Sequence, residues 1–275
     1  LTWPLPALKG WWRSKPHRLV GHLLGHEGEG SLLSLLKAKG WADGLCAGEG
    51  NHTYQDFALF EVRIELTEQG DEAEAAEAAA ALTFGYINML RAAEEARWRE
   101  VYEECTALGE MAFAFRDETA PCETAASLSH SLAWYPPHAC LSGSYLFEEF
   151  APEQIGAVLR CLSPLAALVT HVSPTHAALS SALQQEPWYG TPFTSAAISP
   201  DLLAAWADAP PHAALRLPPP NPFIPTDFSL ACDALVPPST PADPAPNPAA
   251  AATAASKPPP PPPRRPTLAL CPTAA

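Results

Sequence analysis

The clearest hydrophobic pattern in the chain is an alternation between residues 57 and 66. Apolar residues occupy the even positions from 58 to 66, and charged residues occupy the odd positions from 61 to 65. Because successive side chains of a strand point to opposite faces, this pattern predicts a strand with one face in a core. Weaker patterns predict strands over residues 1–5, 41–47 and 165–172.

Most of the remaining sequence has a period of three to four residues, which is typical of helices. The expected helices cover residues 71–93, 96–115, 123–133, 152–162 and 200–207. Prolines support two of these bounds: Pro136 and Pro137 cannot continue the third helix, and Pro152 suits the first turn of the fourth. Strands followed by helices predict an α+β fold.

Two short helices are expected between the first two strands, the first over residues 18–27 and the second after Ser31, running to Lys39. In the first, Gly21 and Gly25 lie opposite a leucine-rich stripe, with His22 and His26 beside them. Each glycine costs about 1 kcal/mol in a helix relative to alanine, so we expect another backbone to approach this face closely. Spacing alone leaves two candidates, a neighbouring helix and a bound peptide.

The loop between these helices carries Glu27 and Glu29 beside exposed amides. A cationic group such as the amino terminus of a peptide could form charge-assisted hydrogen bonds with these carboxylates.

Composition divides the chain in two. Of its 33 prolines, 14 lie between Pro237 and Pro272. A segment so rich in Pro and Ala has little to bury, so we expect residues 1–230 to fold and residues 231–275 to form a disordered tail. Because the chain begins inside an expected strand, we also expect it to be a piece of a larger protein.

The net charge and the cysteine content exclude some classes of partner and location. The net charge of −14 has the wrong sign for a phosphate-binding surface, so nucleic acid is not an expected partner. No apolar run approaches the length of a membrane span, and no membrane partner is expected. Seven widely spaced cysteines, with no Cys-x-x-Cys pair, predict reduced thiols and a cytoplasmic protein.

Several motifs resemble the second domain of the insulysin/nardilysin group of zinc metallopeptidases, the M16 or pitrilysin family. The first is the run from His22-Leu-Leu-Gly-His26-Glu to Lys37-Ala-Lys-Gly-Trp41. The others follow in the family's order: Leu66-Thr-Glu-Gln-Gly70, Phe113-Ala-Phe-Arg116, Trp134-Tyr-Pro136, Trp188-Tyr-Gly-Thr191 and Phe223-Ile-Pro-Thr-Asp-Phe228. The resemblance covers residues 1 to about 230 and implies a mostly antiparallel sheet packed against a layer of helices.

The resemblance also implies a role in which this domain anchors the amino-terminal end of a peptide at an exosite. A separate zinc domain then cleaves the peptide, and a C-terminal half completes the parent enzyme. The positions that match the exosite are Gly21, His22, Gly25 and Glu27 on the helix, with Leu45 and Ala47 on the following strand. Arg18 replaces the family's histidine, and Ala47 replaces its glycine.

The family's zinc signature, His-x-x-Glu-His, does not occur in this sequence. His22 and His26 have the ligand spacing, but Gly25 occupies the position of the general base. The chain alone is therefore expected to be inactive and to hold no cofactor, with zinc in the parent enzyme. The alternatives are a standalone interaction module with a proline-rich tail, and a degenerate metal-binding protein using His22, His26 and a residue such as Glu103.

Overall fold

A computed structural model describes residues 1–50, 53–179 and 183–228 of the 275-residue chain. The predicted tail, residues 231–275, lies outside the described residues. A first unit runs from Leu1 to Ile224, and the fold described below belongs to it.

The principal sheet has three antiparallel strands in the order β1-β3-β2. The strands are β1 (Thr2–Pro6), β2 (Ala42–Gly48) and β3 (Phe57–Leu66). The register pairs Trp3 with Phe60 and Leu45 with Ile64. In the part of the chain that the structure describes, β2 is therefore an edge strand with one unpaired side. A short hairpin, β4 (Gln184–Gln185) and β5 (Pro192–Phe193), forms a second sheet.

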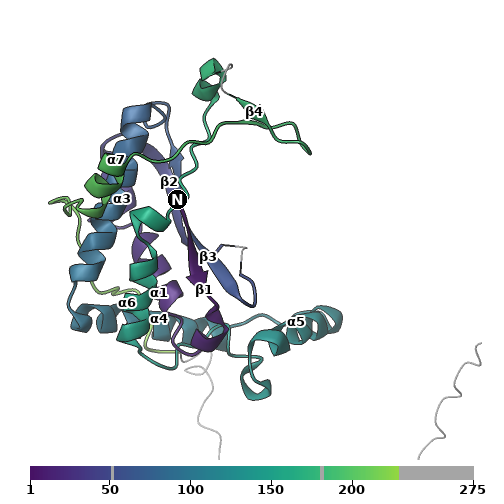
Figure 1. Ribbon diagram of the computed structural model, residues 1–275. Coiled ribbons are helices and arrows are strands. Elements are labelled where there is room, and N and C mark those ends of the chain that lie inside the picture. Colours follow the sequence, from purple (N-terminus) through teal and green to yellow (C-terminus); the bar gives the residue numbers. More distant parts are fainter. Residues whose placement is uncertain (51–52, 180–182, 229–275) are drawn as a thin grey trace, which may run out of the picture. The chain divides into compact units, whose positions relative to one another are not determined.

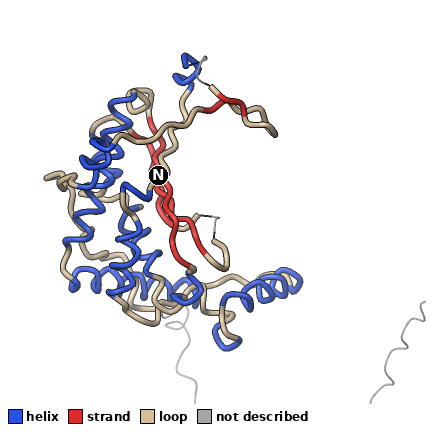
Figure 2. The backbone as a smooth tube through the Cα atoms, in the orientation of Figure 1, coloured by secondary structure: helices blue, strands red, loops and turns tan. Residues whose placement is uncertain are grey.

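Helices cover one face of the principal sheet, as Figures 1 and 2 show for α1, α3, α6 and α7. The helices are α1 (Pro16–Leu24), α2 (Leu32–Ala38), α3 (Ala73–Ala92), α4 (Glu95–Ala114), α5 (Pro121–Trp134), α6 (Pro152–Cys161) and α7 (Pro200–Ala207). Short 3₁₀ turns include Leu8–Trp11 and Pro164–Ala166. The predicted α+β class, with an antiparallel sheet against a helical layer, is confirmed.

The core lies between the sheet and these helices. Trp3 is fully buried and contacts Phe84 of α3 edge-to-face, with ring centroids 5.9 Å apart. Phe84 in turn stacks on Trp206 of α7 at 5.3 Å. These aromatic contacts join β1, α3 and α7, and they fix the sheet face against which α1 also packs.

The strand predicted over residues 165–172 is wrong. The segment opens with the 3₁₀ turn Pro164–Ala166, and only Leu168 pairs with the sheet, through a two-hydrogen-bond bridge to Thr2. The apolar side chains of Leu165, Leu168 and Val172 are exposed. A segment with this pattern forms a strand only where a neighbouring strand can continue its hydrogen-bond ladder. Among the described residues, the pairing of this segment stops at the single bridge to Thr2.

Candidate functional site

A groove of about 730 Å³ runs between α1 and the free side of β2. It brings together every predicted exosite residue: Gly21, His22, Gly25, Glu27, Leu45 and Ala47. Leu45 is buried, so it offers the groove its backbone rather than its side chain. Arg18, His26, Cys46 and the segment Gly48–Gly50 complete the lining.

The two glycines bring β2 against α1. A Cβ atom added to Gly21 would lie 3.1 Å from the carbonyl oxygen of Ala47 and 3.2 Å from the Cα of Gly48. One added to Gly25 would lie 3.5 Å from the backbone nitrogen of Ala47. The backbone that approaches the glycine face is thus a strand of this chain, which differs from both the neighbouring helix and the bound peptide considered above.

This close approach leaves the outer edge of β2 beside the histidines. A Cβ atom at Gly25 would lie 3.8 Å from the methyl carbon of Ala47, so that methyl group faces the helix. It therefore does not project from the free edge, where a peptide would pair. An unpaired strand edge is a row of backbone donors and acceptors that can accept an extended peptide whatever its sequence.

Helix α1 ends earlier than predicted. Its last residue is Leu24, and the N–H of Gly25 closes the final turn on the carbonyl of Gly21. His26 and Glu27 consequently lie beyond the helix, in the turn that leads to α2. Ser31 caps α2 as expected, because its Oγ accepts a hydrogen bond from the N–H of Ser34 at 3.1 Å.

The two glutamates of this turn have different environments. Glu29 forms an ion pair with Arg216, so its charge is already balanced. Glu27 is exposed at the end of the groove, and the described residues give its carboxylate no ion-pair partner. Glu27 is therefore the carboxylate that can receive a cation from outside.

The histidine pair does not fit a zinc site. The rings of His22 and His26 lie 6.5 Å apart, and Nδ1 of His26 accepts a hydrogen bond from the N–H of Gly28. Among the described residues, no group of three or more His, Cys, Asp or Glu side chains is close enough to hold a metal ion. Protein zinc sites use three or four such ligands. We therefore assign no chemistry to a metal here.

The electrostatics around His22 favour a neutral ring. Surrounding protein excludes water from part of the ring, although its edge reaches solvent, and this lowers the pKa of His22. His26 lowers it further, while Glu104 acts in the opposite direction. The acidic residue that influences His22 is thus Glu104, rather than Glu103. A neutral imidazole can donate and accept hydrogen bonds along a peptide backbone.

A charged cluster closes the other end of the groove. The carboxylate of Glu49 lies 3.1 Å from Nε2 of buried His17 and 3.5 Å from Nε of Arg18. Burial alone would raise the pKa of Glu49, but the hydrogen bond and charge of His17, together with Arg18, outweigh burial and lower it. Glu49 is therefore ionised at neutral pH, and its charge is balanced inside the protein.

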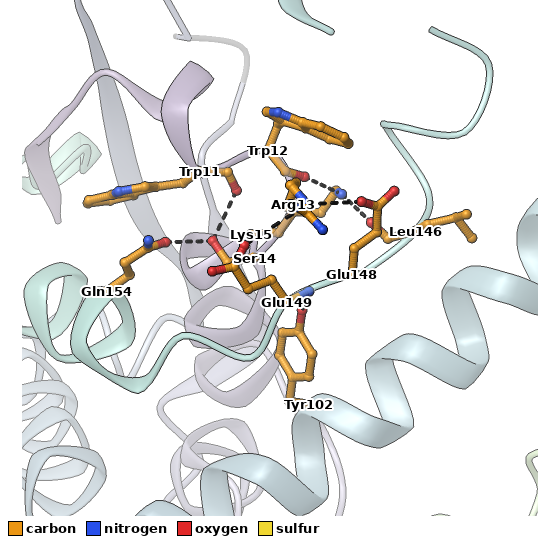
Figure 3. Close-up of polar contacts among 10 residues, drawn as sticks. All are labelled: Trp11, Trp12, Arg13, Ser14, Lys15, Tyr102, Leu146, Glu148, Glu149 and Gln154. Carbon is orange, nitrogen blue, oxygen red and sulfur yellow. Dashed lines mark hydrogen bonds and ion pairs between the residues drawn. The ribbon is translucent and has the colours of Figure 1, made fainter. Parts of the chain in front are cut away.

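A second network holds the wall of this cluster in place (Figure 3). The Lys15 ammonium donates to the carbonyls of Trp12, at 2.6 Å, and Leu146. Arg13 contacts Glu148 at 3.1 Å, and the N–H of Glu148 donates to the carbonyl of Arg13 at 2.8 Å. These bonds tie the segment around residue 146 to the start of α1, where Arg18 also donates to the carbonyl of Ser144.

Sequence reasoning did not identify His17, Lys15 or Glu49 as site residues. Glu49 lies only two positions beyond Ala47, so its place near the exosite strand could have been predicted from the sequence. Lys15 and His17 gave no comparable signal. One partner of Lys15 is more than 100 positions away, and the partner of His17 is a carboxylate just after β2.

Two family models match the sequence. "Peptidase M16 inactive domain" matches residues 1–101, and "Middle or third domain of peptidase_M16" matches residues 113–251. The chain belongs to the M16 peptidase family. In the part of this chain that the structure describes, no helix is both long and apolar enough to cross a membrane.

Individual M16 relatives agree with this assignment. Insulin-degrading enzyme of Mus musculus is 36% identical over 220 residues, which cover 80% of this chain and 21% of the relative. A nardilysin-like protein of Arabidopsis thaliana is 34% identical over 234 residues, covering 84% of this chain and 22% of the relative. The chain therefore spans about a fifth of the length of these curated relatives.

The fold has a solved counterpart. A crystal structure of pitrilysin superimposes with a TM-score of 0.71, covering 83% of this chain and 24% of that one, at 21% sequence identity. At this identity the likeness concerns the fold alone.

Proposed function

We propose that this chain is a non-catalytic part of a zinc metalloendopeptidase of the insulin-degrading enzyme and nardilysin type. Its role is to anchor a peptide substrate, which a separate zinc-bearing domain of the parent enzyme cleaves. The observation that carries this proposal is the groove between α1 and β2. There, within the described residues, a strand edge without a neighbouring strand ends beside a carboxylate without an ion-pair partner.

Each part of the groove has a task in this proposal. The edge of β2 pairs with the peptide backbone and so tolerates many sequences. Glu27 receives the peptide's amino terminus through a charge-assisted hydrogen bond. His22 and His26 line the path, and the peptide then runs along β2 from Leu45 toward Glu49. Hydrolysis itself is assigned to the parent's zinc domain, because this sequence lacks His-x-x-Glu-His.

The five described thiols are free, which fits the proposed cytoplasmic location.

The test is a titration of the full 275-residue chain with a labelled ten-residue peptide, followed by fluorescence anisotropy. We expect acetylation of the peptide's amino terminus to weaken binding about ten- to a hundredfold, since a hydrogen bond to a charged group contributes about 1.5–3 kcal/mol. Glu27→Gln should produce the same loss for the free peptide.

The matched control is Glu29→Gln, two positions away in the same turn. Because Glu29 is already paired with Arg216, this variant should bind the free peptide as tightly as the wild type. Equal affinity for free and acetylated peptides in the wild-type chain would overturn the anchoring role.

A further inference from the structure

A second pocket adjoins the groove at the end away from Glu27. It has a volume of about 510 Å³ and lies between the start of α1 and α5. Arg18, Glu49 and Gly50 line both the pocket and the groove, so the two spaces share a wall. A peptide that follows β2 past Glu49 therefore reaches the mouth of this pocket.

Aromatic side chains form much of the pocket wall. Trp12, Trp134 and Tyr135 line it, and the rings of Trp12 and Tyr135 meet edge-to-face at 6.1 Å. Such contacts give the pocket a packed shape. Buried His17 also lines it, and Nδ1 of this ring has no hydrogen-bond partner among the described residues. The pocket thus has a shaped wall, and a buried polar atom of that wall has no partner among the described residues.

The charge of the pocket is opposite to that of the chain. Among its described lining residues, three cations, Lys9, Lys15 and Arg18, face one carboxylate, Glu49. The whole chain has a net charge of −14. Arg18 balances the charge of Glu49, whose carboxylate also lies 3.1 Å from Nε2 of His17, so Glu49 does not repel an incoming anion strongly. An excess of positive charge remains at the pocket.

These three cations differ in how far their charged groups are available to a ligand. Lys15 is buried and donates to two carbonyl groups, so it contributes its field rather than a direct contact. Lys9 is exposed, and Arg18 is partly exposed at the shared wall. Arg18 has five N–H donors and can bind a second carboxylate while it holds Glu49.

We propose that this pocket binds an acidic side chain of the anchored peptide, which makes Arg18 a specificity-determining residue. This inference rests on the proposed function, because the peptide's direction sets the position that reaches the pocket. Glu49 lies four residues beyond Leu45, and each strand residue advances about 3.3 Å. With the amino terminus level with Leu45, the side chain that enters the pocket is therefore that of about the fifth residue of the peptide.

The experiment uses ten-residue peptides in which a single glutamate moves through positions 2 to 6, each compared with its glutamine counterpart. With the full chain, we expect the glutamate peptide to bind about three- to tenfold more tightly than the glutamine peptide when the glutamate is near position 5. Raising the salt concentration should reduce this preference. Arg18→Gln should abolish it.

Two further variants serve as controls. Lys9→Gln, which removes an exposed cation of the pocket without touching its internal bonds, should reduce the preference even if Arg18→Gln fails to fold. Arg160→Gln removes an exposed cation on α6, away from the pocket, and should leave the preference unchanged.

The outcomes separate this inference from the proposed function. If acetylation weakens binding but glutamate gives no advantage at any position, the pocket assignment is wrong and the anchoring role stands. If the glutamate preference persists while acetylation has no effect, anchoring at Glu27 is wrong. A larger gain from phenylalanine than from glutamate, unaffected by Arg18→Gln, would make the pocket an apolar subsite and overturn its acidic specificity.

Discussion

Lys15 occupies a position that is unfavourable for lysine in two ways. Its backbone is left-handed, with φ 44° and ψ 49°, a conformation that costs a residue with a Cβ atom about 1–2 kcal/mol. Its side chain is also buried, with the ammonium over the ring of Phe147 and bonded to two carbonyls. Its hydrogen bonds join two distant segments, which offsets part of these costs (Figure 3).

The charge of Lys15 makes stability depend on pH. The pKa of Lys15 is lowered from 10.5 to about 8, mainly by burial and also by Arg18, while Glu148 acts in the opposite direction. Between these two values the unfolded chain binds a proton that the folded chain does not, so wild-type stability gains from a rise in pH. Asparagine tolerates the left-handed backbone and does not titrate. From pH 7 to pH 10, the unfolding free energy of the wild type should rise by about 2 kcal/mol relative to Lys15→Asn.

Urea unfolding at both pH values measures this difference, and titration of other groups cancels because both proteins contain them. Lys37→Asn removes an exposed lysine and controls for the general effect of a lost charge. A wild-type advantage that stays constant or shrinks as pH rises would contradict the assignment of a buried, destabilised ammonium.

At the scale of elements, the groove depends on how closely β2 approaches α1. Gly21→Ala would place a methyl group 3.1 Å from a carbonyl oxygen and 3.2 Å from a Cα, and neither backbone atom can rotate away. We expect a loss of about 1–3 kcal/mol in unfolding free energy from this overpacking. The displaced strand should also bind peptide more weakly, which anisotropy would measure on the folded variant.

Gly156→Ala in α6 is the matched control. Its added methyl group would meet only the end of the flexible Arg160 side chain, at 3.3 Å. Alanine is the better helix former, so this variant should gain up to about 1 kcal/mol. If urea unfolding shows the same direction of change for both variants, the close approach of β2 is not what requires Gly21.

Elements with strong local signals were predicted well. The bounds of β3 and α7 agree with the sequence prediction, because strict alternation defines the first, and Ser199 with Pro200 begins the second. The end of α1 was predicted wrongly. The hydrophobic periodicity continues to His26, but Gly25 closes the last turn and His26 bonds to the following backbone.

The predicted exosite residues lie together in the structure because their separation in sequence is short. The pocket beside them was not predictable, since the bonds that build its walls join segments more than 100 residues apart.

At the scale of the whole molecule, the groove can be located by its cysteine. Cys46 lies on β2, is exposed and lines the groove. Cys122 is also exposed but lies at the start of α5. Cys105 is buried, and burial raises the pKa of its thiol to about 12. Because only the thiolate reacts readily, alkylation at pH 8 should modify Cys46 and Cys122 well before Cys105.

A peptide that occupies the groove would cover Cys46, which lines it, and leave Cys122 open. We therefore expect a saturating, unacetylated peptide to slow alkylation of Cys46 several-fold while Cys122 reacts at its original rate, with each site followed by mass spectrometry. At the same peptide concentration, Glu27→Gln should lose this protection, because the amino terminus is no longer held. Equal slowing of both thiols would indicate a general effect of the peptide. Protection of neither thiol, at a concentration where anisotropy shows binding, would place the peptide outside the groove that Cys46 lines.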